Sequence, residues 1–183
     1  MSSLRYEGPN ENSLSDVQKE IYDEIVSSRK STGIQGPFRV WLGNPEICLH
    51  SQRLGRTVRY NLNSLSKRES EFVILIVAKY MNCETEWILH KNEALDAGLE
   101  VDIIHHLEEN EEKPFNFNEK DEALYFFSLA VLKDSSNIEQ ALYDKCSKEF
   151  SEIGTMEIVS LIGYYTYVAF TLNTFKIKTN VKN

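Results

Sequence analysis

The sequence predicts an all-α protein of seven or eight helices. Its 183 residues include only 8 glycines and 4 prolines, so turn signals are few. Helix caps and apolar residues at 3-and-4 spacing recur along the chain. The longest apolar run follows a capping-box pattern and has no turn residues beside it. These three observations favour long helices over a many-stranded sheet.

Composition and charge narrow the class of protein further. The chain is 42% hydrophobic and 26% charged, close to the globular average, which excludes intrinsic disorder over most of its length. At this size a chain buries roughly 70% of its unfolded surface and needs no disulfide or metal to have a core. The formal net charge of −8 and the lack of a basic run exclude non-specific nucleic-acid binding.

The cysteines indicate a reducing compartment. Cys48, Cys83 and Cys146 are odd in number and widely spaced, and no CxxC pair is present. This pattern predicts neither a disulfide framework nor a zinc knuckle. The first twelve residues are polar and lack the apolar segment of a signal peptide, so we expect a cytoplasmic protein.

The chain is predicted to hold one helical domain, residues 13–177, between a flexible arm at residues 1–12 and a tail at residues 178–183. Ser13 or Ser15 can cap the first helix. A loop is predicted at residues 31–37, because two glycines in this segment favour turns over helix. The apolar positions of that first helix are Val17, Ile21, Tyr22, Ile25 and Val26.

Two further helices begin at recognisable caps. Asn44 followed by a proline opens a helix that reaches about Tyr60. The residues Ser66 to Glu69 have capping-box spacing and precede the apolar run Phe72 to Ala78. Periodicity alone would also permit a buried strand there. The cap and the absence of turn residues instead predict a helix buried on nearly all sides.

The middle of the chain continues in helices. One is predicted from about Cys83 to Ala97, ended by Gly98, and a short amphipathic helix covers Val101 to Leu107. The acidic stretch Glu108 to Asn118 is predicted as a surface loop. Asn118 then caps a helix with one apolar side, formed by Ala123, Leu124, Phe127, Ala130 and Val131.

Two helices complete the chain. One begins at Ser136 or Asn137 and runs to Phe150, and Thr155 caps a last helix that ends near Lys176. Residues 158–175 of the last helix carry no formal charge, which meets the length criterion for a membrane span. Its many hydroxyl and amide groups would need partners in lipid, so we expect a core helix or a subunit interface and no membrane.

One short segment concentrates side chains that can carry chemistry. On a helix, Cys83, Glu86 and His90 are spaced i, i+3 and i+7 and share one face. A carboxylate beside an imidazole fixes its tautomer and raises its basicity. The helix start is expected to lower the pKa of the Cys83 thiol. An ordinary surface pair of Glu86 and His90 is the open alternative.

Other candidates lie outside that segment. Glu71 is either an exposed first-turn acid that suits the helix dipole or a carboxylate that faces the helix of His90. His50 is a weaker pocket candidate, with an exposed histidine as the alternative. Tyr164 and Tyr165 can line the pocket or only pack in the core. No metal site is expected, because the adjacent histidines at 105 and 106 point about 100° apart on a helix.

The spacing of these residues resembles that of the carboxymuconolactone decarboxylase family, which includes the alkylhydroperoxidase-D-like proteins. Its peroxidase members carry a glutamate, eleven residues, a CxxC pair, three residues and a histidine. Here Glu71, Cys83 and His90 match the glutamate, the first cysteine and the histidine, while Glu86 holds the second cysteine position. The resemblance is strongest over residues 66–99 and extends more weakly from residue 36 to residue 173.

The resemblance implies an all-α fold in which a helical hairpin holds the site and subunits assemble as trimers or hexamers. It implies no organic cofactor and no metal. Peroxidase members attack peroxide with one cysteine and resolve the sulfenic acid with the other, while a glutamate and a histidine relay protons. Decarboxylase members lack the pair and use the histidine as an acid–base group on a carboxylated lactone.

The glutamate at position 86, where peroxidase members have their second cysteine, decides which function we predict. Without a second cysteine there, Cys83 cannot form the local disulfide, and the nearby charge disfavours a thiolate. We therefore expect a decarboxylase-like enzyme that acts on a small carboxylated molecule, with His90 as acid–base group, Glu86 and Glu71 as its carboxylates, and Cys83 at the pocket edge. One alternative is a thiol peroxidase that uses Cys83 with Cys48, Cys146 or an outside thiol. Another is a non-catalytic oligomeric scaffold.

Overall fold

The computed structural model describes residues 4–29, 34–109 and 115–178. These residues form one short 3-10 helix and eight α-helices, and no strand occurs among them. The all-α prediction is therefore confirmed. The helices are η1 (Glu11–Ser13), α1 (Asp16–Ser28), α2 (Pro37–Trp41), α3 (Pro45–Tyr60), α4 (Lys67–Tyr80), α5 (Glu84–Asp96), α6 (Val101–Glu109), α7 (Glu119–Asp134) and α8 (Gln140–Phe175).

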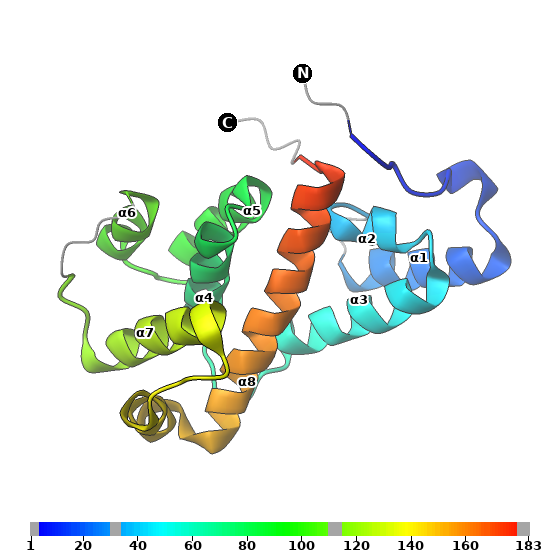
Figure 1. Cartoon of the computed structure of the whole chain (residues 1–183). Helices are drawn as coiled ribbons and strands as arrows, with labels where there is room; N and C mark the ends of the chain where they lie inside the picture. Colours follow the sequence, from blue (N-terminus) through cyan, green and yellow to red (C-terminus); the bar gives the residue numbers. More distant parts are fainter. Residues whose placement is uncertain (1–3, 30–33, 110–114, 179–183) are drawn as a thin grey trace.

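The long helix α8 divides the molecule. Helices α4 to α7 lie on one side of it and α1 to α3 lie on the other, as Figure 1 shows. Helices α4 and α5 pack against each other as a hairpin, and α4 also packs against α7 and α8. On the far side, α3 and α2 contact α8 directly. A residue on α8 can therefore meet residues from both halves of the chain.

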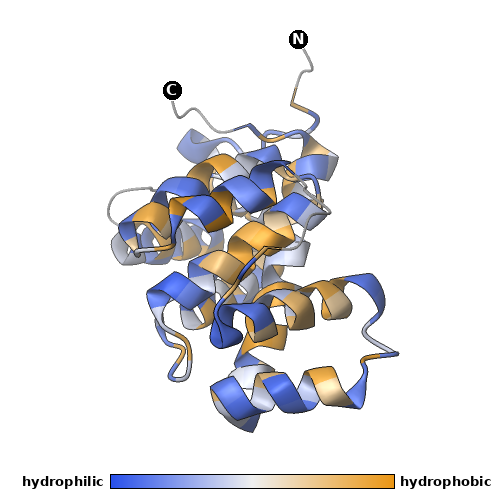
Figure 2. Ribbon diagram, turned by 90° about the vertical axis from the view of Figure 1, so that its left-hand side faces the viewer, coloured by the Kyte–Doolittle hydropathy of each residue, from blue (hydrophilic) through white to orange (hydrophobic). Residues whose placement is uncertain are grey.

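Helix α4 forms the centre of the core. Every residue from Phe72 to Ala78 is buried, as the uninterrupted apolar run predicts, and the burial extends back to Glu69, which the run did not predict. The capping box that marks its start is also present, with Ser66 and Glu69 bonding to each other's backbone. Most other helices carry hydrophilic and hydrophobic residues along their length, as Figure 2 shows, so each has a face to turn inward.

Two polar contacts fix the far side onto α8. The Trp41 indole N–H donates to the Thr171 hydroxyl at 3.0 Å, and the Trp41 ring stacks on Tyr167 with centroids 4.6 Å apart. The carboxylate of Glu157 accepts hydrogen bonds from the backbone N–H groups of Asn63 and Ser64. These contacts hold α2 and the α3–α4 connection in place, and α2 borders the cavity described below.

Most predicted helix ends are confirmed. Asn44, Ser66 and Asn118 cap their helices, and Gly98 follows α5 with a φ of 88°. Ser15 rather than Ser13 caps α1. The sequence reading missed α2, which begins at Pro37 where a loop was expected to end. The loop predicted from Glu108 to Asn118 is wrong for its first two residues, because α6 runs to Glu109. Residues 110–114 of that predicted loop lie outside the described residues.

The last helix differs from its prediction in two ways. Glu139 precedes its first residue, so neither Ser136 nor Asn137 caps it. Ser151 has φ 65° and ψ 170°, which bends the helix, and its hydroxyl accepts a hydrogen bond from the Gly154 N–H at 3.2 Å. The break after Phe150 was predicted, but Ser151 and not Thr155 caps the second part, since only the former has non-helical backbone angles.

Helix α8 is the one described helix long and apolar enough to cross a membrane, but 56% of its most apolar window is buried inside the protein. That burial is typical of a core helix. The arm also contacts this helix, because the Arg5 N–H and guanidinium bond the carbonyl oxygens of Phe175 and Thr174. Of the predicted arm, loop and tail, residues 1–3, 31–33 and 179–183 lie outside the described residues.

Candidate active site

The α4–α5 hairpin brings the predicted site residues together. Asn82 adopts a φ of 49°, a left-handed conformation that asparagine tolerates, and the Cys83 N–H bonds the Ala78 carbonyl at 2.8 Å. This turn ends α4 and begins α5 within three residues. Glu71 on α4 and His90 on α5 therefore face each other across the hairpin.

His90 lies between two carboxylates. Its Nδ1 is 2.6 Å from Oε2 of Glu71, and its Nε2 is 3.3 Å from Oε2 of Glu86. The exposed fractions of Glu71, Glu86 and His90 are 2%, 5% and 3%. The ring is also held edge-on against Tyr165, with centroids 5.2 Å apart. The imidazole thus has one orientation, and each ring nitrogen has a carboxylate partner.

The two carboxylates decide the charge of His90. Burial by itself lowers the pKa of the imidazole, because the charged form loses its water. The hydrogen bonds to Glu71 and then Glu86 outweigh burial and raise the pKa to about 9. At neutral pH the ring is therefore an imidazolium between two acidic groups, and it holds a proton that it can give away.

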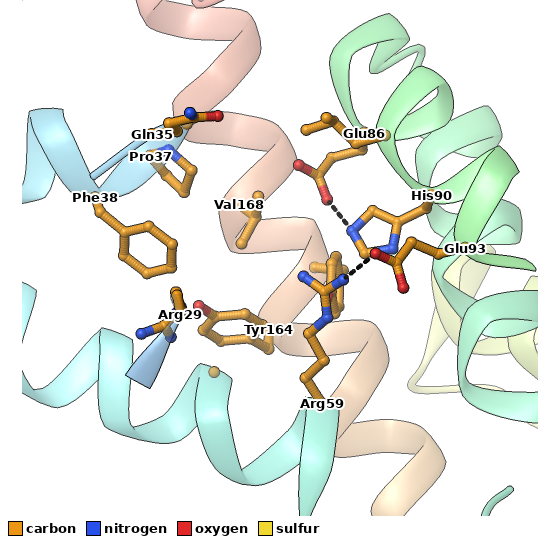
Figure 3. Close-up of a pocket in the computed structure, with 14 residues that line it drawn as sticks. Arg29, Gln35, Pro37, Phe38, Arg59, Glu86, His90, Glu93, Tyr164 and Val168 are labelled. Carbon is orange, nitrogen blue, oxygen red and sulfur yellow. Dashed lines mark ion pairs between the residues drawn. The ribbon is translucent and has the colours of Figure 1, made fainter. Parts of the chain in front are cut away.

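A cavity of about 150 Å³ opens beside this pair. Figure 3 shows Glu86 and His90 on one side of it and Phe38 and Tyr164 on the other. Its walls come from four separate segments: the end of α1 with the start of α2, α3, α5 and α8. The lining residues are Arg29, Gln35, Gly36, Pro37, Phe38, Gly55, Arg59, Glu86, Leu89, His90, Glu93, Tyr164, Tyr165 and Val168.

Two arginines and a third carboxylate also line the cavity. The Arg29 guanidinium lies 4.4 Å above the Phe38 ring and donates to the Gln52 side chain and backbone. Arg59 lies nearer His90 and is 3.6 Å from the carboxylate of Glu93 (Figure 3). Glu71 and Arg59 also line a second cavity of about 350 Å³. The site therefore has charged groups on both sides of the imidazole.

Both predicted tyrosines line the cavity. Tyr164 and Tyr165 are buried on α8, and burial raises the pKa of each phenol well above its ordinary value. Gly55 on α3 makes room for the first of them, because a Cβ there would lie 2.0 Å from the Tyr164 hydroxyl oxygen. The phenols therefore stay protonated and can donate a hydrogen bond to a ligand.

Cys83 does not join the site, contrary to the prediction. It belongs to the turn before α5, with non-helical φ −98° and ψ 86°, so it does not share the face of Glu86 and His90. It lines a different cavity, with Trp87 and Glu108. Burial raises the pKa of its thiol to about 11, although the Glu86 and Thr85 N–H groups oppose that rise. Burial therefore outweighs the lowering expected from the helix start, and the prediction of a lowered pKa is wrong for the net shift.

His50 is the second predicted residue that the structure separates from the site. It is exposed on α3 and does not line the cavity. Within the described part of the chain, no three His, Cys, Asp or Glu side chains are grouped so that they could hold a metal ion.

The sequence reading missed Arg29, Arg59 and Glu93. One signal for Arg59 was available, since Gln52, Gly55 and Arg59 are spaced i, i+3 and i+7 on α3 and form a polar, glycine-containing stripe on a face turned inward. A buried polar stripe with a glycine at its centre is typical of a helix that approaches a ligand or a neighbouring backbone closely. Arg29 follows the end of α1 and offers no comparable pattern.

No protein-family model matches the sequence, and no curated protein is significantly similar to it. Solved structures with the same architecture do exist. An alkylhydroperoxidase AhpD core, an uncharacterized peroxidase-related protein from Ralstonia eutropha JMP134, is 17% identical with a TM-score of 0.81, over 97% of this chain and 93% of that chain. An uncharacterized peroxidase-related protein from Silicibacter sp. TM1040 is 13% identical with a TM-score of 0.78, over 97% and 92%.

A third similar structure has a named activity. It is the debrominase Bmp8 in complex with 2,3,4-tribromopyrrole, 12% identical to this chain with a TM-score of 0.74, over 99% of this chain and 94% of that chain. Identities this low establish a common fold and nothing about the reaction.

Proposed function

We propose that this chain, which has the fold of the alkylhydroperoxidase-D-like proteins, is a cofactor-free enzyme that resembles carboxymuconolactone decarboxylase and acts on a small carboxylated substrate. His90 is the general acid–base group, Glu86 is its partner at the cavity wall, and Glu71 is its partner inside the protein. The fold is that of the similar solved structures. The reaction is our inference from the site.

The observation that carries this proposal is the arrangement of one imidazole and two carboxylates next to a cavity. Glu86 and His90 line the cavity, and His90 reaches Glu71 through its other nitrogen. A histidine with a pKa raised to about 9 holds a transferable proton at neutral pH, which is what general acid catalysis needs. Glu71 lines the second cavity, which offers a route for that proton to be replaced.

A suitable substrate carries its carboxylate on the carbon next to a carbonyl group, or on a carbon joined to the carbonyl through one C=C bond. The bond between that carbon and the carboxylate breaks, CO2 leaves, and the electron pair passes to the carbonyl oxygen as an enolate. The His90 imidazolium, directly or through Glu86, returns one proton to carbon, and one proton from solvent restores the pair. The enolate collapses to the carbonyl product, so one proton is consumed for each CO2 released.

The remaining lining supports a small ligand with an apolar body. Pro37, Phe38, Leu89 and Val168 supply apolar wall area. The charged groups of Arg59, Glu86 and His90 lie together on one side of the cavity (Figure 3), so an apolar body and a polar end of one ligand can both be matched. The debrominase of the same fold is bound to tribromopyrrole, itself a small ring compound.

The peroxidase alternative draws support from two similar structures described as peroxidase-related. It needs a reactive thiolate at Cys83, whereas that thiol is buried, outside the main cavity, and has its pKa raised to about 11. The scaffold alternative needs a filled site, whereas a cavity borders His90. We therefore favour acid–base chemistry. Homo-oligomeric assembly and a cytoplasmic location stay predictions.

The proposal is tested by CO2 release from carboxylated lactones and β-keto acids. The wild-type protein is expected to release CO2 from a member of this panel, and His90→Ala to lower kcat roughly 100-fold or more, the usual size of an acid–base contribution. His50→Ala is the matched control, because His50 is exposed and remote from the cavity. Absence of turnover across the panel, or full activity of His90→Ala, would reject the proposal.

A further inference from the structure

Arg59 projects from α3 into the cavity on the side of the acid–base pair. Figure 3 shows its guanidinium beside Glu93 and His90, across the cavity from Phe38. The residue is only partly buried, so part of its surface faces the open space. An arginine stays charged at any accessible pH and offers five N–H donors in a planar fork.

The three carboxylates near Arg59 all have another cation as a partner, and one of them, Glu93, also forms an ion pair with Arg59. Glu71 and Glu86 both bond His90. Glu93 accepts a hydrogen bond from Lys67 at 2.8 Å and stands 3.6 Å from the Arg59 guanidinium, which is too far for a hydrogen bond. The guanidinium of Arg59 also lies over the ring of Tyr60, with its central carbon 5.3 Å from the ring centroid. In the described residues, then, no acceptor takes a hydrogen bond from this guanidinium.

We propose that Arg59 is the anion-binding residue of the cavity and receives the carboxylate of a small ligand. This inference rests on the proposed function and deepens it, since it assigns the residue that orients the substrate. A carboxylate matches the guanidinium fork with two parallel hydrogen bonds, which fixes direction as well as position. The body of the ligand then lies against the apolar wall formed by Pro37, Phe38 and Val168.

A carboxylate bound to Arg59 would also place the rest of the ligand for proton transfer. The guanidinium and the Glu86–His90 pair line the same small cavity, so a ligand held by its carboxylate on Arg59 presents its adjacent carbons to the proton donor. Of the cavity's two arginines, the other, Arg29, is held by Gln52 and stacked on Phe38 away from the pair (Figure 3). Arg59 is therefore the one that can align a ligand for proton transfer.

Binding of benzoate and of benzamide, its uncharged analogue of similar shape, tests the inference by calorimetric or NMR titration. We expect the wild-type protein to bind benzoate more tightly than benzamide. Arg59→Gln is expected to weaken benzoate binding about tenfold or more, the effect of losing hydrogen bonds to a charged group, and to leave benzamide binding unchanged. Arg59→Lys keeps the charge but loses the fork, so its affinity for benzoate is expected to be intermediate.

Arg56→Gln is the matched control, because Arg56 is exposed on the same helix and does not line the cavity. It is expected to bind benzoate like the wild type. The inference is overturned if the wild type does not prefer benzoate to benzamide, or if Arg59→Gln binds benzoate as the wild type does. A far-ultraviolet circular dichroism spectrum and a urea midpoint for each variant separate lost binding from lost folding. Because the readout is binding, it can succeed or fail independently of turnover.

Discussion

His90 Nδ1 lies 2.6 Å from the Oε2 of Glu71, a residue nineteen positions earlier in the chain, and both side chains are almost fully shielded from water. Such a pair costs free energy when its groups leave water, so it persists only when charges and hydrogen bonds compensate. Here Glu86 supplies the second acceptor. The raised pKa of the imidazole shows that the two carboxylates stabilise its charged form by more than burial destabilises it. The charge state of His90 is therefore linked to both stability and proposed function.

Stability is expected to fall as pH rises above 6.5. The pKa of His90 is about 9 in the folded protein and near its ordinary 6.5 in the unfolded chain. Below 6.5 both states hold the proton and the stabilisation is complete; above it the unfolded chain releases the proton first, so the stabilisation is lost as pH approaches and passes 9. The pKa difference corresponds to a loss on the order of 3 kcal/mol. Urea unfolding at pH 6.5 and 8.5 measures most of it.

The control for that measurement is His90→Gln, whose free energy of unfolding is expected to change little between these two pH values. At pH 8.5 the three buried cysteines also lower stability slightly, because part of each thiol, with an ordinary pKa of 9.0, ionises in the unfolded chain. The variant carries the same three thiols, so the difference between it and the wild type isolates His90. NMR titration gives the same quantity directly, with the His90 ring titrating above 8 and Glu71→Gln shifting it lower. An imidazole that titrates near 6.5 in the folded protein would contradict the arrangement.

Gly55→Ala is expected to destabilise the protein although alanine is the better helix former. A Cβ at this position would meet the Tyr164 hydroxyl oxygen at 2.0 Å and its ring carbon at 2.4 Å, so the tyrosine must move. Overpacking of this kind costs roughly 1–3 kcal/mol. Gly163→Ala is the matched control, because its Cβ would meet no atom within 4 Å. Alanine there should raise the free energy of unfolding by roughly 0.5–1 kcal/mol, since it loses less backbone entropy than glycine on folding. Equal effects in urea unfolding would refute the packing argument.

Cys83 is expected to resist oxidation in the folded protein. Its thiol is 1% exposed and its pKa is raised to about 11, so little thiolate forms at neutral pH. Treatment with hydrogen peroxide and a sulfenic-acid trap, followed by mass spectrometry, should label Cys83 only after urea is added. Cys83→Ala should retain the turnover of the wild type. Selective labelling of Cys83 in the folded protein would revive the thiol peroxidase alternative.

Local patterns predicted most of the helices correctly. The caps at Asn44, Ser66 and Asn118 were found because a cap depends on residues within one turn of each other. The buried helix α4 was found because the seven apolar residues Phe72 to Ala78 leave no polar face and a capping box precedes them. The caps of α8 were missed because several serines, asparagines and threonines compete there, and backbone angles select among them.

The site was only partly readable from the sequence. The spacing of Glu86 and His90 on one helix predicted their contact, and the motif that includes Glu71 placed it opposite. Cys83 was misplaced because the pattern assumed helical geometry one residue too early, whereas Asn82 turns the chain there. Arg59 and Glu93 meet only because α3 and α5 lie on the same cavity.

The sequence by itself determined the helical class, the helical hairpin and the contact between Glu86 and His90, since each depends on residues a few turns apart or on a motif with fixed spacing. The tertiary structure decided which residues face the cavity. Arg29, Arg59 and Tyr164 come from three separate elements, and Gly55 lets one of them approach. Their convergence depends on how helices pack around α8, and packing is set by the whole core rather than by any one segment.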